Sequence, residues 1–416
     1  MKKKIFNYVG VSIKQQLQQS RLCSKITIFS ILINMLICFT ICTIIYADQA
    51  ASGTEKTSLE LFTGNTMGTT YYIKVVMQKI DNKDPLSPSL NKNSLSKRTL
   101  SNLSKNSLHY LIEEKLKQVN QSMSVYSKDS EISLFNKSDK EDVTTISPDF
   151  YSVMLSANKL YTITEGAWDG TVKPLVDLWG FGTKKEILNI PSSEIIRAHL
   201  QTTGFKHIVI GHQTLQKQNS AITLDLGSIA KGFGVDAVAQ LLKNQGYFNF
   251  LVEIGGEVFA SGEKVYSEQH SEKKRDNSAE KKAVAEEKTE SKSWMVGISR
   301  PDKGQNSNEI YHAFPLRNKA LATSGDYRNF ITINGKSYSH IINPATGYPV
   351  NNGVVSASVI SDTCTFADGL ATALMIMGQE KGIRLVNSLE NTECLIVVRD
   401  KNGNLADYRS EKFPLP

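Results

Sequence analysis

The residues whose types and spacing suggest chemistry lie in two neighbouring segments near the C-terminal end of the sequence. In the first, His340 follows an alternating run at 330–333 and a turn residue, Gly335, and it precedes Pro344 and Pro349. This pattern predicts a histidine at the end of a strand, in a stretch that the prolines make rigid. A histidine held in this way is suited to accept a proton. The alternative is a histidine that only hydrogen-bonds the strand end to the following turn.

The second segment, 367–378, has helical periodicity and carries Asp368 and Thr372 four residues apart. Their side-chain oxygens therefore lie on one face of the predicted helix, while the apolar positions of the run point into the core. Two hard oxygen ligands on one face suit Mg²⁺. Because such pairs are common on surface helices, the alternative is a capped helix beside a hydrogen-bonded histidine.

Two glycine-containing segments are further candidates for ligand contact. Residues 225–232, DLGSIAKG, follow a predicted strand and precede a predicted helix, so their backbone groups are suited to meet a phosphate or its metal. They match neither the dinucleotide fingerprint nor the P-loop spacing. In 166–182, Trp168, Trp179 and Phe181 alternate with glycines that let backbone approach a flat ligand. The alternative for this segment is an aromatic-lined turn of the core.

The elements that position these residues follow from periodicity and from turn signals. The patterns predict helices at 108–123, 148–164, 191–203 and 233–244. They predict two strands around a turn at 64–68, together with strands at 206–210, 221–226, 248–259 with a bulge at Gly255 and Gly256, 294–298, 313–316, 320–323 and 330–333.

Two polar stretches, 79–107 and 263–293, have too little apolar surface to order themselves. We interpret them as insertions that interrupt a single domain. Two cysteines, Cys364 and Cys394, lie outside the N-terminal region. They are consistent with one disulfide or with two buried thiols.

The N-terminal region has the pattern of an export signal or a membrane anchor. Residues 1–25 carry six basic side chains and no acidic one, and the apolar run 26–46 follows. The run is longer than the ~7 to 15 residues of a signal core and close to the ~20 of a spanning helix, which favours an uncleaved anchor over cleavage near Ala47. The basic segment is then expected in the cytoplasm and the rest of the chain outside it.

The charge of the chain argues against a polyanion as partner. Its formal net charge is +7, but six of the basic groups belong to the N-terminal segment. The remainder, with a net charge of about +1, has no excess that would attract a nucleic acid.

Eight motifs, in order, carry a resemblance to a known family. They are TMGTTY (66–71), MSVYSKDSEISLFN (123–136), AWDGTVKPLVDLWGFG (167–182), TLDLGSIAKGFGVD (223–236), VEIGGEV (252–258), ATSGDY (322–327), SHIINPATGYP (339–349) and ADGLATAL (367–374). With them the chain resembles the FAD:protein FMN transferase family, also called the ApbE type. The resemblance implies an α+β fold, here one domain at 59–416 of mixed or antiparallel sheets with packed helices.

The resemblance also assigns expected roles residue by residue. It places FAD against Met67, Tyr126, Ala167, Trp168, Asp169, Asp225, Lys231 and Ile342. The backbone carbonyl of Ser228 joins Asp368 and Thr372 on Mg²⁺, and His340 is the expected base. Ala371 stands where some members have a second metal-binding Asp, and Asn343 stands where many have Asp.

The expected reaction is Mg²⁺-dependent transfer of FMN from FAD to a Ser or Thr hydroxyl of a flavoprotein subunit, with release of AMP. The implied acceptor belongs to a membrane redox complex, such as a sodium-pumping NADH:quinone oxidoreductase, and the catalytic domain is expected on the periplasmic side of the inner membrane. One alternative is an FAD pyrophosphatase that gives FMN and AMP. Another is an exported FAD carrier without turnover.

Overall fold

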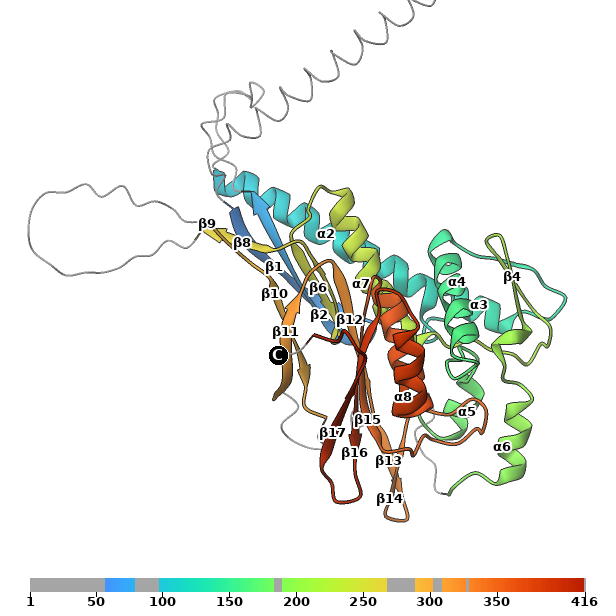
Figure 1. Cartoon of the computed structure of the whole chain (residues 1–416). Helices are drawn as coiled ribbons and strands as arrows, with labels where there is room; N and C mark the ends of the chain where they lie inside the picture. The colour runs from blue at the N-terminus through green and yellow to red at the C-terminus, as the bar shows by residue number, and fades with distance from the viewer. Residues whose placement is uncertain are drawn as a thin grey trace, which may run out of the picture. The chain divides into compact units, whose positions relative to one another are not determined.

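The computed structural model describes residues 57–78, 97–182, 189–267, 289–301, 309–326 and 329–414 (Figure 1). The described residues from 57 onward belong to one compact unit. The predicted anchor at 26–46 lies outside the described residues. Within the described part of the chain, no helix is both long enough and apolar enough to cross a membrane.

The centre of the fold is an eight-stranded sheet in which every neighbouring pair is antiparallel. Its strands, in spatial order, are β1 (Thr57–Thr66), β2 (Thr69–Gln78), β6 (Phe250–Ile254), β7 (Glu257–Ser261), β12 (Lys319–Gly325), β15 (Val354–Ser361), β16 (Glu393–Arg399) and β17 (Leu405–Arg409). Strand β15 is buried along its whole length because both faces of the sheet are covered there.

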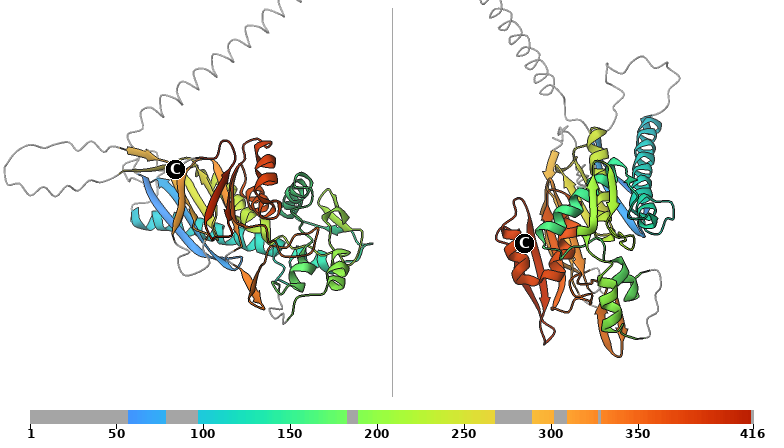
Figure 2. Two further views of the ribbon diagram at one scale, coloured as in Figure 1. Left: turned by 60° about the horizontal axis from the view of Figure 1, so that its bottom comes forward. Right: turned by 90° about the vertical axis from the view of Figure 1, so that its right-hand side faces the viewer.

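The two faces of the sheet belong to different cores. On one face, side chains such as Cys394 and Ile396 pack against the helices α2 (Lys97–Met123), α7 (Gly227–Asn244) and α8 (Cys364–Asn387) (Figures 1 and 2). On the other face, the alternate residues Leu395 and Val397 pack against β10 (Trp294–Ser299) and β11 (Ile310–Leu316). This alternation is the period of two that a strand imposes.

A second group of short elements lies beside the helical face. It contains α3 (Glu131–Lys137), α4 (Pro148–Ile163), α5 (Lys173–Leu178), α6 (Ser193–Leu200), η1 (Phe205–His207) and the small sheet of β3 (Thr144–Thr145), β5 (Thr214–Lys217) and β4 (Ile208–Gly211). Ser130, Ser147 and Ser192 cap the first turns of α3, α4 and α6 with their hydroxyls. The hairpin of β13 (Phe330–Ile333) and β14 (Lys336–Ser339) leads into the segment of His340.

Several predicted elements are confirmed with small differences at their ends. Helices occur at the predicted positions 148–164 and 191–203, and strands occur at 294–298, 313–316, 320–323 and 330–333. The first two strands meet at a turn of Met67 and Gly68, with φ of 49° and 72°, which is narrower than predicted. Both Cys364 and Cys394 are buried free thiols, so the disulfide alternative is wrong.

The two polar stretches are shorter than predicted. Helix α2 begins at Lys97 rather than at 108, and its first turns are held to the sheet by Lys105, whose ammonium lies 2.6 Å from the Glu60 carboxylate. The second stretch begins and ends in paired strands, β8 (Lys264–Ser267) and β9 (Thr289–Lys292). Residues 79–96 and 268–288 lie outside the described part of the chain.

The prediction of one bulged strand at 248–259 was wrong. Strands β6 and β7 form a hairpin, and Gly255 and Gly256 are its turn, with φ of 60° and 99°. Positive φ at both central residues suits the right-handed twist of a two-residue hairpin, and glycine adopts it without a steric cost. A Gly-Gly pair inside an apolar run therefore indicated a turn here.

The predicted strand at 221–226 and the predicted start of α7 were also wrong. Residues 221–226 join no ladder. The Asn136 side chain takes the place of a neighbouring strand, because it accepts from the Leu224 amide at 2.7 Å and donates to the Leu224 carbonyl at 2.9 Å. Helix α7 begins at Gly227, six residues before the predicted Phe233, and the Asp225 carboxylate accepts from the Gly227 amide at 2.9 Å. Ser228 and Lys231 therefore lie within the helix.

Candidate active site

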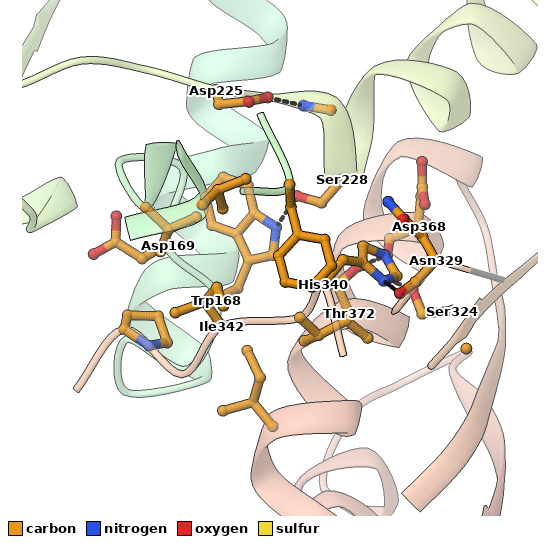
Figure 3. A pocket seen from close by; sticks show the side chains of 18 of the residues that line it. Trp168, Asp169, Asp225, Ser228, Ser324, Asn329, His340, Ile342, Asp368 and Thr372 are labelled. Carbon is orange, nitrogen blue, oxygen red and sulfur yellow. Dashed lines mark hydrogen bonds between the residues drawn. The ribbon is translucent and has the colours of Figure 1, made fainter. Parts of the chain in front are cut away.

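A cavity of about 340 Å³ brings together ten of the twelve residues that the sequence singled out (Figure 3). These are Ala167, Trp168, Asp169, Asp225, Ser228, Lys231, His340, Ile342, Asp368 and Thr372. They come from four places in the chain: the segment after α4, the start of α7, the segment after β14 and the first half of α8. The fold therefore assembles one site from segments up to about 200 residues apart in the sequence.

The other two residues, Met67 and Tyr126, line a neighbouring cavity of about 660 Å³. This second cavity shares Asp225, Gly227 and Lys231 with the first. Tyr126 is 79% exposed, so most of its side chain is open to solvent beside this cavity. The two cavities together offer an elongated ligand a path that passes Lys231.

The close crossing of α7 and α8 fixes the centre of the site. A Cβ at Gly232 would lie 2.3 Å from the Cys364 carbonyl oxygen, so the two helices approach at a distance that only glycine permits. One turn further along α7, the Asp236 carboxylate accepts from the amides of Cys364 and Thr365, each at 2.8 Å. These are the first amides of α8. The carboxylate satisfies them as hydrogen-bond acceptor, and the positive end of the helix dipole stabilises its negative charge.

A buried charge cluster lies at this crossing. The Lys231 ammonium is 2.8 Å from the Glu257 carboxylate and 3.7 Å from the Asp368 carboxylate, and both acids are at most 2% exposed. Burial alone would lower the pKa of Lys231, but Asp368 and Glu257 outweigh burial and raise it, so the ammonium stays charged. Burial raises the pKa of Asp368, and Lys231 and the Gly232 amide offset only part of that rise.

The oxygens around Asp368 fit a small divalent cation. One cation and two carboxylates leave the cluster with an excess negative charge, and the oxygens beside it come from Asp368, Thr372 and Ser228, which suit Mg²⁺. The Gly232 amide, which a regular helix would give to the Ser228 carbonyl, donates to Asp368 at 3.1 Å. The Ser228 carbonyl oxygen is therefore not the sole acceptor of this amide. Across the described ranges no group of three or more His, Cys, Asp or Glu side chains forms a metal site.

His340 is held in a single orientation at the wall of the cavity. Its Nδ1 donates to the Asn329 carbonyl at 2.9 Å, and its backbone amide donates to the same oxygen at 3.2 Å. This contact sets the neutral tautomer with the proton on Nδ1, so Nε2 keeps its lone pair. Burial lowers the pKa of His340, the contact with Asn329 offsets part of this effect, and the charge of Lys231 lowers the pKa further. The arrangement suits a base that is neutral near pH 7.

The segment of Trp168 and Trp179 is both core and cavity wall. Both indole rings are buried, which favours the aromatic core turn. Trp179 donates to the Gly347 carbonyl at 2.8 Å and so ties this segment to the turn after His340. Trp168 donates to the Ser228 hydroxyl at 2.9 Å and lines the cavity, as Phe181 does.

Asp169 and Ile342 lie in the cavity wall with structural contacts of their own. The Asp169 carboxylate accepts from the Thr171 amide and hydroxyl and from the Phe205 amide, at 2.8, 2.6 and 3.0 Å. Burial raises the pKa of Asp169, and these donors offset part of the rise. Ile342 packs with Trp179 in a small apolar cluster. These contacts fix the shape of the wall.

Sequence reasoning missed three residues of the site. Glu257 pairs with Lys231, the Ser324 hydroxyl lies 2.9 Å from the Thr372 hydroxyl, and Asn329 orients His340. Glu257 and Ser324 lie within the motifs VEIGGEV and ATSGDY. The motifs therefore marked these two positions, but the sequence assigned neither residue a role. Asn343 forms a turn by accepting from the Ala345 amide at 2.9 Å, which either Asn or Asp can do.

Comparison with known proteins gives consistent matches. The sequence matches the ApbE family over residues 67–396. It is 36% identical to an FAD:protein FMN transferase of Vibrio cholerae over 365 residues, which covers 87% of this chain and 94% of the relative. It is 34% identical to an FAD:protein FMN transferase of Haemophilus influenzae over 355 residues, which covers 84% of this chain and 89% of the relative.

Solved structures agree with these sequence matches. The flavin transferase ApbE from Vibrio cholerae superposes with a TM-score of 0.68 at 34% identity, and the match covers 86% of this chain and 98% of that one. The apo form of the flavinyl transferase ApbE from Pseudomonas stutzeri gives 0.67 at 29% identity, with 86% and 97% covered. The mixed helix and sheet architecture described above is therefore that of these transferases.

Proposed function

The chain belongs to the ApbE family, and on this basis we propose that it transfers FMN from FAD to a Ser or Thr hydroxyl of an acceptor protein and releases AMP. That it is a transferase acting on the flavin of FAD follows from the family and its curated relatives. We further propose that the transfer depends on Mg²⁺, and we propose the roles of the site residues and the class of acceptor.

The observation that carries the proposal is the pairing of a base with a cation-binding group in one cavity. The lone pair of His340 Nε2 and the Asp368 carboxylate belong to the same 340 Å³ space, with Lys231 beside them. In the proposed step the acceptor hydroxyl attacks the phosphorus on the FMN side of the pyrophosphate. The P–O bond to AMP breaks, AMP takes the bridging oxygen, and His340 takes the hydroxyl proton. Such general-base help is worth about 10² to 10⁴ in rate.

Asp368, Thr372 and the Ser228 carbonyl would hold Mg²⁺, which when bound neutralises and orients the pyrophosphate. Lys231 contributes a permanent positive charge at the same place, since its ammonium stays protonated. Ser324 holds the Thr372 hydroxyl, and Trp168 holds the Ser228 side chain. The first contact restricts the rotamer of Thr372, whose hydroxyl would have to meet the metal in one geometry, and the second ties Trp168 to the start of α7.

The decisive experiment combines the purified full-length protein with FAD, Mg²⁺ and an exported flavoprotein subunit of a membrane redox complex. We expect FMN covalently added to the subunit and one AMP released per FMN, and we expect neither product with EDTA. Free FMN with AMP and no modified subunit would instead indicate an FAD pyrophosphatase. FAD bound without AMP would indicate a carrier.

We also propose that the domain works outside the cytoplasm, attached through residues 26–46. The support is the six basic residues before this apolar run, because a positive flank stays on the cytoplasmic side. A periplasm-dependent reporter fused after Ala50 should be active and should remain in the membrane fraction. A reporter that is active only in the cytoplasm would contradict this orientation.

A further inference from the structure

Glu257 is a buried acid with no role in the proposed chemistry so far. It is the first residue of β7, directly after the turn of Gly255 and Gly256, and it is 1% exposed. Its carboxylate lies 2.8 Å from the Lys231 ammonium, which is a charge-assisted hydrogen bond. The stem of Lys231 passes so close to Gly255 that a Cβ there would lie 3.3 Å from its Cδ. The hairpin turn therefore both admits and holds this lysine.

Lys231 is held unequally by its two acids. The distance to Glu257 is that of a hydrogen bond, whereas 3.7 Å to Asp368 is an ion pair without one. Asp368 has a second partner of its own, the Gly232 amide at 3.1 Å. If FAD draws the ammonium away from Asp368, the contact with Glu257 can remain.

We propose that Glu257 is a positioning residue that keeps the Lys231 ammonium at the boundary of the two cavities, aimed at the FAD pyrophosphate and off the metal ligand Asp368. The proposal rests on the proposed function and deepens it. Without this anchor the ammonium is free to move onto Asp368. There it would repel a divalent cation, and it would no longer contact the pyrophosphate. Glu257 then supports both FAD binding and Mg²⁺ binding by acting through Lys231.

The test uses two binding measurements on the full chain that need no turnover. FAD affinity is measured by flavin fluorescence without Mg²⁺, and Mg²⁺ affinity is measured by calorimetry without FAD. Glu257→Gln removes the negative charge, and Glu257→Asp keeps the charge but shortens the side chain. In both variants we expect both affinities to fall about tenfold, the scale of one lost hydrogen bond to a charged group.

A purely electrostatic role makes the opposite forecast for FAD. Removing a negative charge in Glu257→Gln would then strengthen binding of the anionic FAD, and Glu257→Asp would behave as wild type. Either of these results, or unchanged affinities in both variants, overturns the proposal. The control Glu60→Gln removes the acid of another Lys–Glu pair, at 2.6 Å from Lys105 on β1, and should change neither affinity.

Thermal unfolding of every variant separates positioning from a general loss of structure. If Glu257→Gln does not fold, Glu257→Asp is sufficient for the test. The positioning role predicts weaker binding of both ligands in Glu257→Asp, whereas the purely electrostatic role predicts wild-type binding. The wild-type transfer assay is run in parallel. Normal wild-type transfer with unaltered affinities in the variants rejects only the role of Glu257, whereas absent wild-type transfer with weakened affinities rejects the function and keeps the role.

Discussion

At the scale of the residue, the reaction depends most on His340. The hydrogen bond from its Nδ1 to Asn329 leaves Nε2 as the acceptor within the cavity. His340→Ala should therefore bind FAD normally and lose FMN transfer by about 10² or more, the scale of a lost base. The measurement is transfer per folded, FAD-loaded molecule. FAD hydrolysis should fall less, because water brings solvent that can carry the proton away.

The pH dependence of wild-type transfer tests the same residue from another side. A base acts when it is deprotonated, and burial lowers the pKa of His340 below its ordinary value of about 6.5. The acidic limb of kcat/KM should then lie below pH 6.5, with full activity kept near neutrality. A limb above pH 6.5, or a near-normal transfer rate in His340→Ala, would favour a histidine that only ties the strand end to the Pro344 turn.

Asp368 and Thr372 should differ in their effect on the metal. Asp368 is a buried carboxylate, whereas Thr372 offers a neutral hydroxyl already shared with Ser324. We expect Asp368→Ala to abolish Mg²⁺-dependent turnover and Thr372→Ala to raise the Mg²⁺ concentration required. Titration of turnover with Mg²⁺ checks both, and unchanged Mg²⁺ dependence in Asp368→Ala would remove it as a ligand.

At the scale of the element, the crossing of α7 and α8 should tolerate no side chain. A Cβ at Gly232 would meet the Cys364 carbonyl at 2.3 Å and the Asp368 Cβ at 2.9 Å. Gly232→Ala must push the helices apart, which should cost about 1 to 3 kcal/mol of stability and weaken Mg²⁺ binding. Urea unfolding and calorimetry measure the two effects.

Gly297→Ala in β10 is the matched control for this crossing. There the nearest atom to an added Cβ is 3.4 Å away, and φ is not in the left-handed region. It should change stability little and Mg²⁺ binding not at all. Equal effects of the two substitutions would show that the crossing is not specially constrained.

At the scale of the whole molecule, the two polar stretches should be dispensable only outside the paired elements. Replacing 268–288 with a short Gly-Ser linker should leave turnover near wild type, since this sequence lacks the apolar content of a core. Deleting 81–96 should do the same.

Deleting 81–106 should lower the unfolding free energy by about 1 kcal/mol or more, because it removes helical hydrogen bonds of α2 and the pair of Lys105 with Glu60. Thermal unfolding and FAD turnover distinguish the three, and equal stability of the two N-terminal deletions would contradict the early start of α2.

The sequence by itself determined which segments carry the chemistry. The strand before His340 and the helix of Asp368 and Thr372 follow from alternation, prolines and helical spacing, and these are local properties that the structure repeats. Ordered motifs were enough to indicate the family and its α+β fold, and the structure narrows the sheets of the described residues to antiparallel pairs.

Only the tertiary structure decided how these segments meet. Gly255 and Gly256 form a hairpin turn, and residues 221–226 join no ladder, while the side chain of Asn136, 88 residues away, pairs with Leu224. The Lys231 and Asp368 side chains meet because Gly232 lets two helices cross, and Glu257 joins them from a strand. Such partners are set by packing between elements distant in the sequence, where no local period or turn preference acts.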